Sequence, residues 1–221
     1  MDLTTFTPSS ALVTVVLLAL APFVAIMVTS FTKIVVVLSL LRNALGVQQV
    51  PPNLVLNGLA MILTIYVMYP VGLQITDRIT LSDQSLETTD GLLDIANHAK
   101  EPVREFLVKH SNELERAWFY STVQSMTRET ETGIESQVNS DDFVVVLPAF
   151  IISELSEAFQ IGFLIYLPFI IIDLVVSNIL MALGMMMLSP TIVSLPFKLL
   201  LFVMVDGWAK LSHGLVLSYF T

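Results

Sequence analysis

Three ionisable residues stand inside long apolar runs of this sequence, where an unpaired charge is unstable. They are Glu154, Asp173 and Lys198. A charge at bilayer depth costs at least about 2.5 to 3.5 kcal/mol on insertion scales, so such residues are paired, hydrated or functional. Two acids and one base on separate predicted helices indicate an ion-pair network. Glu157 lies one turn after Glu154, so that pair alone also fits a solvent-exposed helix junction.

The same carboxylates permit a different function. Acids inside a transporter can carry protons. Glu154 and Asp173 are therefore also candidates for a relay in a proton-coupled membrane transporter, which we rank below the structural ion pair.

A second candidate site is a run of methionines before a helix break. Met185, Met186 and Met187 lie between Gly184 and the pair Ser189-Pro190, so part of the run is predicted to be a loop. Methionine is unbranched and polarisable, so it repacks around variable shapes. Consecutive methionines can also be ordinary apolar filler, but at a membrane turn we interpret them as a deformable seal.

Motifs for catalysis are missing from the sequence. The chain has no cysteine, no phosphate-binding loop and no H-E-x-x-H or G-x-S-x-G motif, and its histidines lack metal-ligand spacing (His98, His110 and His213). We therefore expect no enzyme activity, no cofactor and no metal. The net charge of −9 also argues against nucleic acid as a partner.

Composition sets the environment of these residues. Of the 221 residues, 55% are hydrophobic and only 13% are charged, and the mean hydropathy is +0.80. Soluble domains carry about 25% charged residues. The sequence therefore predicts a membrane protein.

The charges divide the chain into three predicted segments. Residues 76–142 carry fourteen acids and six bases, a net charge of −8 of the total −9. Apolar spacings of three and four between Asp90 and Tyr120 predict helices there, with a new helix starting at Pro102. We predict an acidic, extracytoplasmic helical module, flanked by apolar residues 1–75 and 143–221.

The flanking segments are predicted to be apolar helices. Segment 1–75 forms a hairpin around the loop Arg42–Asn53, with its second helix at Leu54–Ile75. In segment 143–221, the polar patch Ser153–Gln160 separates two apolar runs, and breaks are expected at Ser189-Pro190 and Pro196. Lys33, Arg42 and Lys198 flank the turns, so the positive-inside rule places the turns in the cytoplasm.

Long stretches of the chain resemble the SctR/FliP family, the core export-gate protein of bacterial type III secretion. The first signature is Pro148–Phe163, which contains Ser153-Glu154-Leu155-Ser156-Glu157. The second comprises Leu167-Pro168-Phe169, Ile172–Val176, Met181–Pro190 and Ser194–Leu199, and the front of the chain matches at Thr29–Ile34 and Arg42–Gly46.

The resemblance implies a function that composition does not. Members of the family form a ring of identical subunits, here expected to be pentameric. The ring is completed by two smaller export-gate membrane proteins (SctS and SctT type) and joined by a switch protein (SctU type), and it makes a gated conduit for unfolded substrates. By resemblance, Met185, Met186 and Met187 form the pore gasket, and Glu154, Asp173 and Lys198 bridge neighbouring subunits. The expected fold is all-α, with membrane-associated hairpins and an inserted acidic domain in a ring-like assembly.

The resemblance also bears on location and branch. The complex is expected in the bacterial inner membrane, in contact with lipid and towards the periplasmic face, so apolar helices that look membrane-spanning pack largely on other subunits. Flagellar members commonly begin with a cleavable signal peptide and a longer front segment, whereas this chain starts at Met1-Asp2, directly before its first apolar run. This difference favours the injectisome, or virulence, branch over the flagellar one. A third hypothesis is a lipid-facing scaffold whose acidic module recruits other proteins.

Overall fold

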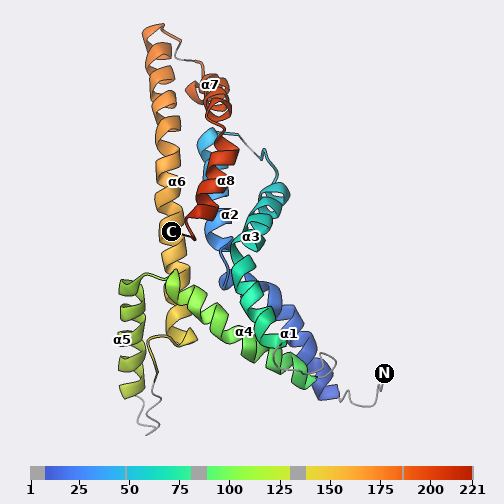
Figure 1. Cartoon of the computed structure of the whole chain (residues 1–221). Coiled ribbons are helices and arrows are strands. Elements are labelled where there is room, and N and C mark those ends of the chain that lie inside the picture. The colour runs from blue at the N-terminus through green and yellow to red at the C-terminus, as the bar shows by residue number, and fades with distance from the viewer. Residues whose placement is uncertain (1–7, 48, 81–88, 130–137, 186, 221) are drawn as a thin grey trace. The chain divides into compact units, whose positions relative to one another are not determined.

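A computed structural model describes residues 8–47, 49–80, 89–129, 138–185 and 187–220. This described part consists of helices and their connections and contains no strand, which confirms the all-α prediction (Figure 1). In chain order its helices are α1 (Pro8–Met27), α2 (Phe31–Leu45), α3 (Asn53–Thr80), α4 (Thr89–Lys109), α5 (Glu113–Glu129), α6 (Phe143–Ala182), α7 (Pro190–Met204) and α8 (Gly207–Leu217).

Helix α6 contradicts one prediction from the sequence. The polar patch Ser153–Gln160 is predicted to separate two helices, but α6 runs unbroken through it for 40 residues. The patch contains Glu, Leu, Ala and Gln, which are strong helix formers, and it contains no glycine or proline. A polar patch changes which face of a helix can be buried, but it does not end the helix.

Two predicted proline boundaries are also wrong. Pro102 lies inside α4 and Pro196 lies inside α7, instead of starting or breaking a helix. A proline removes one backbone donor and crowds the preceding turn, which can bend a helix without ending it. The break falls instead between α7 and α8, where Asp206 adopts a left-handed conformation with φ of 52°.

The described helices belong to two compact units. The first unit comprises residues 1–30 and 68–153, and therefore includes α4 and α5. In this unit α4 packs on the start of α6, where the rings of Phe106 and Phe150 meet edge-on with centroids 5.8 Å apart. Leu107, the next residue of α4, is completely buried. The acidic segment is thus packed against an apolar helix.

The second unit comprises residues 31–67 and 154–221, and it holds all the candidate site residues. Helix α2 packs closely on α6 at Gly162, which has no side chain. A Cβ atom placed on Gly162 would lie only 2.2 Å from Leu40 Cδ1. A buried apolar cluster joins α2, α3, α6 and α8; its members are Ile34, Val37, Leu38, Leu56, Ala60, Ala158 and Leu215.

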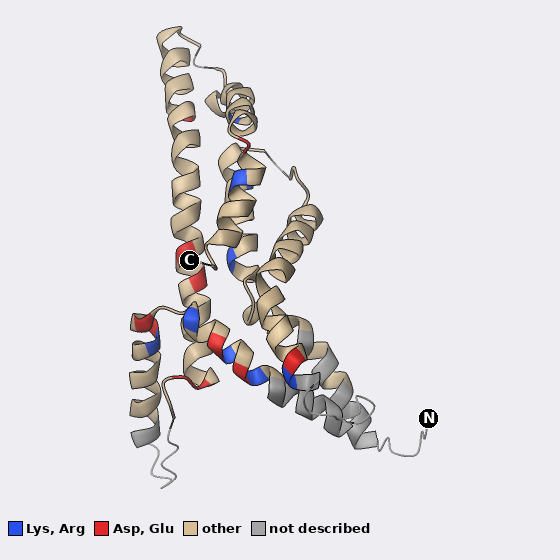
Figure 2. Ribbon diagram, viewed as in Figure 1, with Lys and Arg blue, Asp and Glu red and all other residues tan. Residues whose placement is uncertain are grey.

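The predicted segments and the compact units divide the chain by different properties. The predicted boundary at residues 75 and 76 falls inside α3, and the one at 142 and 143 falls at the start of α6. Figure 2 shows charges gathered along α4 and α5 and only isolated charges on α6, α7 and α8. The charged residues are concentrated in the predicted acidic segment, whereas the contacts between helices define two units with other boundaries. The three-segment organisation therefore stays a prediction.

Two of the described helices are long and apolar enough to cross a membrane. They are the stretch Asn53–Arg78 in α3 and the whole of α6, Phe143–Ala182. Helices α7 and α8 together pass the same test, but a bend of 59° separates them. Only 28% of the apolar window in α3 and 17% of that in α6 is buried within the chain. Most of both surfaces therefore faces lipid or another protein.

Candidate functional site

A buried lysine is the centre of the first charged cluster. The Lys33 ammonium lies 3.1 Å from Oε1 of Glu154 and 2.6 Å from Oε2 of Glu157. The same ammonium sits over the Tyr219 ring, 4.1 Å from its centroid, and the Tyr219 hydroxyl donates a hydrogen bond to Glu154. The exposed fraction of Lys33 is 1% and that of Glu154 is 0%, so this ion pair is dry.

Three elements bring this cluster together. Lys33 lies on the buried face of α2, one and two turns before Val37 and Leu41. Glu154 belongs to α6 and lies in the polar patch Ser153–Gln160. Tyr219 follows the end of α8 and is 3% exposed, so it ties the end of the described chain to α2 and α6.

The cluster contains one ammonium, two carboxylates and one tyrosine hydroxyl, and their arrangement decides how each charge is compensated. Two carboxylates share one ammonium, but Glu157 is half exposed and can also be solvated by water. Burial, followed by the charge of Glu154, raises the pKa of Tyr219 above its usual value. The hydroxyl therefore stays protonated and donates to Oε2 of Glu154, while Oε1 lies beside the Lys33 ammonium.

The second charged cluster joins α6 to α7. The Lys198 ammonium donates to Oδ2 of Asp173 at 2.6 Å and to the carbonyl oxygen of Ala44 at 3.3 Å. The Ser194 hydroxyl donates to Oδ1 of Asp173 at 2.5 Å. The Lys198 side chain is 4% exposed and that of Asp173 is 32% exposed. Asp173 and Lys198, two members of the predicted three-residue network, are thus paired within one chain, and Glu154 is not part of this cluster.

The two clusters are separate. Glu154 and Asp173 were expected on different helices, but both lie on α6, nineteen positions apart. At 1.5 Å per residue this is about 28 Å along the helix. Direct proton transfer between the two carboxylates is excluded by that distance, so the geometry does not favour the relay.

Met185 and Met187 lie in a loop that is bounded on both sides by helix-end signals. Gly184 has φ of +74°, and the amides of Gly184 and Met185 donate to the carbonyl oxygens of Met181 and Leu180 in a Schellman motif. Pro190 then starts α7 at its first turn. Met185 is 47% exposed and Met187 fully exposed.

Met186 lies outside the described residues. At least two of the predicted gasket methionines therefore present their side chains outward from a loop.

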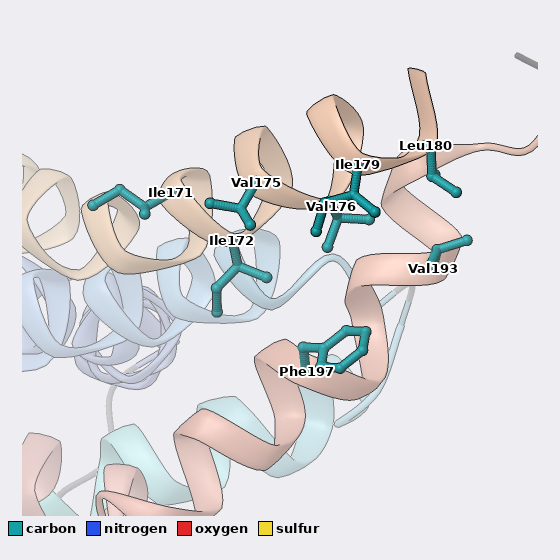
Figure 3. A pocket seen from close by; sticks show the side chains of 8 residues that line it. All are labelled: Ile171, Ile172, Val175, Val176, Ile179, Leu180, Val193 and Phe197. Atoms are coloured by element: carbon teal, nitrogen blue, oxygen red, sulfur yellow. The ribbon is translucent and has the colours of Figure 1, made fainter. Parts of the chain in front are cut away.

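An apolar groove of about 420 Å³ lies between α6 and α7. Ile172 and Val176 of α6 point towards Phe197 of α7 across it (Figure 3). Every residue that lines the groove is hydrophobic. Among the described residues, no group of three or more histidine, aspartate or glutamate side chains is placed to hold a metal ion.

Sequence reasoning missed the main partners of Glu154. It treated Lys33 only as a charge flanking a turn, and it did not single out Tyr219. The helical spacing of Lys33 with Val37 and Leu41 is a signal that could have placed this lysine on a buried face. No local signal identifies Tyr219, because its contact with Glu154 spans 65 positions.

The fold and the site define a class of protein: an all-helical membrane protein in which two buried lysines of apolar helices, Lys33 and Lys198, form ion pairs within the chain. The profile of the FliP family matches residues 13–215. The chain therefore belongs to the FliP family.

The chain is similar over nearly its whole length to several secretion and virulence proteins. The hypersensitivity response secretion protein HrcR of Ralstonia nicotianae is 50% identical, with 96% of this chain and 97% of that protein covered. The Yop proteins translocation protein R of Yersinia pestis is 52% identical, with 92% of each covered. The virulence protein YscR of Salmonella typhimurium is 43% identical, with 92% of this chain and 93% of that protein covered.

These similarities confirm the resemblance noted from the sequence. The relatives are injectisome proteins, which agrees with the predicted branch. The chain is thus a component of a type III secretion apparatus, and its apolar helices make it an integral membrane protein.

Proposed function

We propose that the chain is the pore-forming core subunit of the type III export gate. Copies of it, with the SctS-type and SctT-type proteins and the SctU-type switch protein, form a gated conduit for unfolded substrates across the bacterial inner membrane. In this proposal the chain has no catalytic role, and the assembled complex lies towards the periplasmic face.

The exposed methionine loop is the observation that carries the proposal. Met187 is fully exposed in the described part of the chain, so its thioether can meet other copies or a passing substrate. A loop held by Gly184 at one end and Pro190 at the other can keep its position while its side chains change rotamer. A ring of such loops can close on itself and reshape around different side chains.

The gasket is tested by replacing Met185, Met186 and Met187 with alanine in cells that express the whole export apparatus. We expect increased leakage of small ions, because three long side chains are lost from every copy. Met181→Ala is a matched control, since Met181 is also exposed (55%) but lies in the last turn of α6. An assembled triple variant that leaks no more than this control would refute the gasket.

We further propose that Glu154, Asp173 and Lys198 contribute to contacts between subunits. Glu154 and Lys198 are buried and paired within the chain, so a neighbour would reach these clusters through Asp173 or Glu157, which remain partly exposed. The native mass of the Asp173→Ala variant, extracted with the two smaller gate proteins, tests this contact. A shift from the ring to smaller species is expected, and an unchanged ring would contradict it.

A further inference from the structure

Arg42, near the end of α2, has unused hydrogen-bonding capacity. Its Nη1 atom donates to Oδ1 of Asn53 at 2.5 Å and approaches the carbonyl oxygen of Pro51 at 3.5 Å. Its Nη2 and Nε atoms have no partner among the described residues, and within that part of the chain no carboxylate forms an ion pair with it. An arginine offers five N–H donors in a planar fork, so most of its donors remain available.

A polar pocket of about 540 Å³ opens at this guanidinium. It lies at the turn from α2 to α3, and no acidic residue of the described part of the chain lines it; the described lining residues are Arg42, Asn43, Gly46, Val47, Gln49 and Asn53. The chain as a whole has a net charge of −9. A cavity that holds a cation and no acid is therefore suited to a negatively charged ligand.

The position of the pocket indicates where that ligand comes from. The pocket residue Asn53 is also the first residue of the candidate span Asn53–Arg78, so the pocket lies at one end of an apolar helix. The next two residues of α3 are apolar and point outward: Leu54 is 82% exposed and Val55 is 55% exposed. Headgroups flank the hydrocarbon core of a bilayer at the ends of such helices.

We propose that this pocket binds the phosphate of an anionic phospholipid. The free edge of Arg42 donates to the phosphate oxygens, a geometry that a guanidinium can satisfy with two parallel bonds. The acyl chains then lie along the exposed apolar start of α3. This lipid site does not depend on the proposed conduit, because it needs only the described turn and a membrane.

Lipid retention by the purified full-length chain tests the proposal. The chain is extracted in detergent, supplied with equal amounts of dioleoyl phosphatidylglycerol and dioleoyl phosphatidylcholine, and analysed by native mass spectrometry. We expect preferential retention of phosphatidylglycerol. Arg42→Gln should weaken this retention by about tenfold, the equivalent of one charged hydrogen-bonding group.

Lys210→Gln is the matched control. Lys210 is an exposed cation on α8, and no ion pair of it occurs among the described residues. Its variant should retain phosphatidylglycerol as the unmodified chain does. Equal loss in both variants, or no loss in Arg42→Gln, would overturn the assigned site.

Two further measurements separate the charge of Arg42 from its geometry, and a lipid ligand from a free anion. Arg42→Lys preserves the charge but loses the fork, so its retention should fall between those of the unmodified chain and Arg42→Gln, while its circular dichroism spectrum stays unchanged. Soluble glycerol phosphate separates the lipid from a free anion. If it displaces phosphatidylglycerol at equimolar concentration, the pocket recognises free phosphate and the lipid assignment is wrong.

Discussion

The substitution Lys33→Met separates charge compensation from packing in the first buried cluster. It keeps an unbranched side chain of similar length but removes the ammonium that faces Glu154, Glu157 and Tyr219. Glu154 is then a fully buried carboxylate with a single tyrosine donor. Removing one partner of a buried ion pair typically costs about 3 to 5 kcal/mol.

That cost is dominated by Glu154. Glu157 is half exposed and can turn towards water, so it contributes at most about 1 kcal/mol. For a chain of this size each kcal/mol lowers the midpoint of thermal unfolding by about 2 to 4 °C. We therefore expect Lys33→Met to lower the midpoint by about 6 to 20 °C, measured by circular dichroism in detergent at pH 7.

The double variant Lys33→Met/Glu154→Gln gives the decisive comparison. It removes the uncompensated charge but keeps an acceptor for the Tyr219 hydroxyl. It should be more stable than Lys33→Met by about 2 kcal/mol, although it carries one more substitution. Lys210→Met, at an exposed position, should change stability by less than about 0.5 kcal/mol. If the effects of the two site substitutions simply add, the charge argument is refuted.

Two further substitutions probe the packing of the same unit. Gly162→Ala places a methyl group 2.2 Å from Leu40 Cδ1 and 3.2 Å from Leu40 Cβ, so we expect the free energy of unfolding to fall by about 1 to 3 kcal/mol. At Gly58 an added methyl group meets no atom within 4 Å, so Gly58→Ala should instead stabilise α3 by up to about 1 kcal/mol in the same unfolding assay. Asp173→Asn leaves the buried Lys198 ammonium without its anion and should cost about 2 to 3 kcal/mol, less than a fully buried pair because Asp173 is 32% exposed. Adding Lys198→Met should recover part of that loss, and no recovery would contradict a charge effect.

Local signals in the sequence predict the helix ends around the methionine loop. Gly184 supplies the left-handed residue that a Schellman motif needs, and Ser189-Pro190 supplies a start for α7. The end of α7 also had such a signal, since Asp206-Gly207 is a turn dipeptide. It was overlooked because the apolar run on both sides looked continuous. Prediction worked where local backbone chemistry decides the structure.

The partners of the buried charges could not be predicted in the same way. The sequence singles out Glu154, Asp173 and Lys198 because each charge interrupts an apolar run, but it does not say which acid pairs with Lys198. The pairing of Glu154 depends on how α2 lies against α6, and this packing depends on Gly162 meeting Leu40. Such close approach is a tertiary property that neither periodicity nor hydropathy records.

The two clusters together explain how one exposed loop can be held by an otherwise apolar unit. Asp173 fixes α7 through Lys198 and Ser194 close to the loop, whereas Glu154 fixes the end of α8 through Tyr219. Hydrophobic contacts alone permit sliding along α6, because neighbouring apolar side chains offer similar burial. A buried ion pair permits no such shift, since a displaced charge loses its partner in a medium of low dielectric. The charges inside the apolar helices thus fix the register of α7 and α8 against α6, and with it the position at which the methionines are presented.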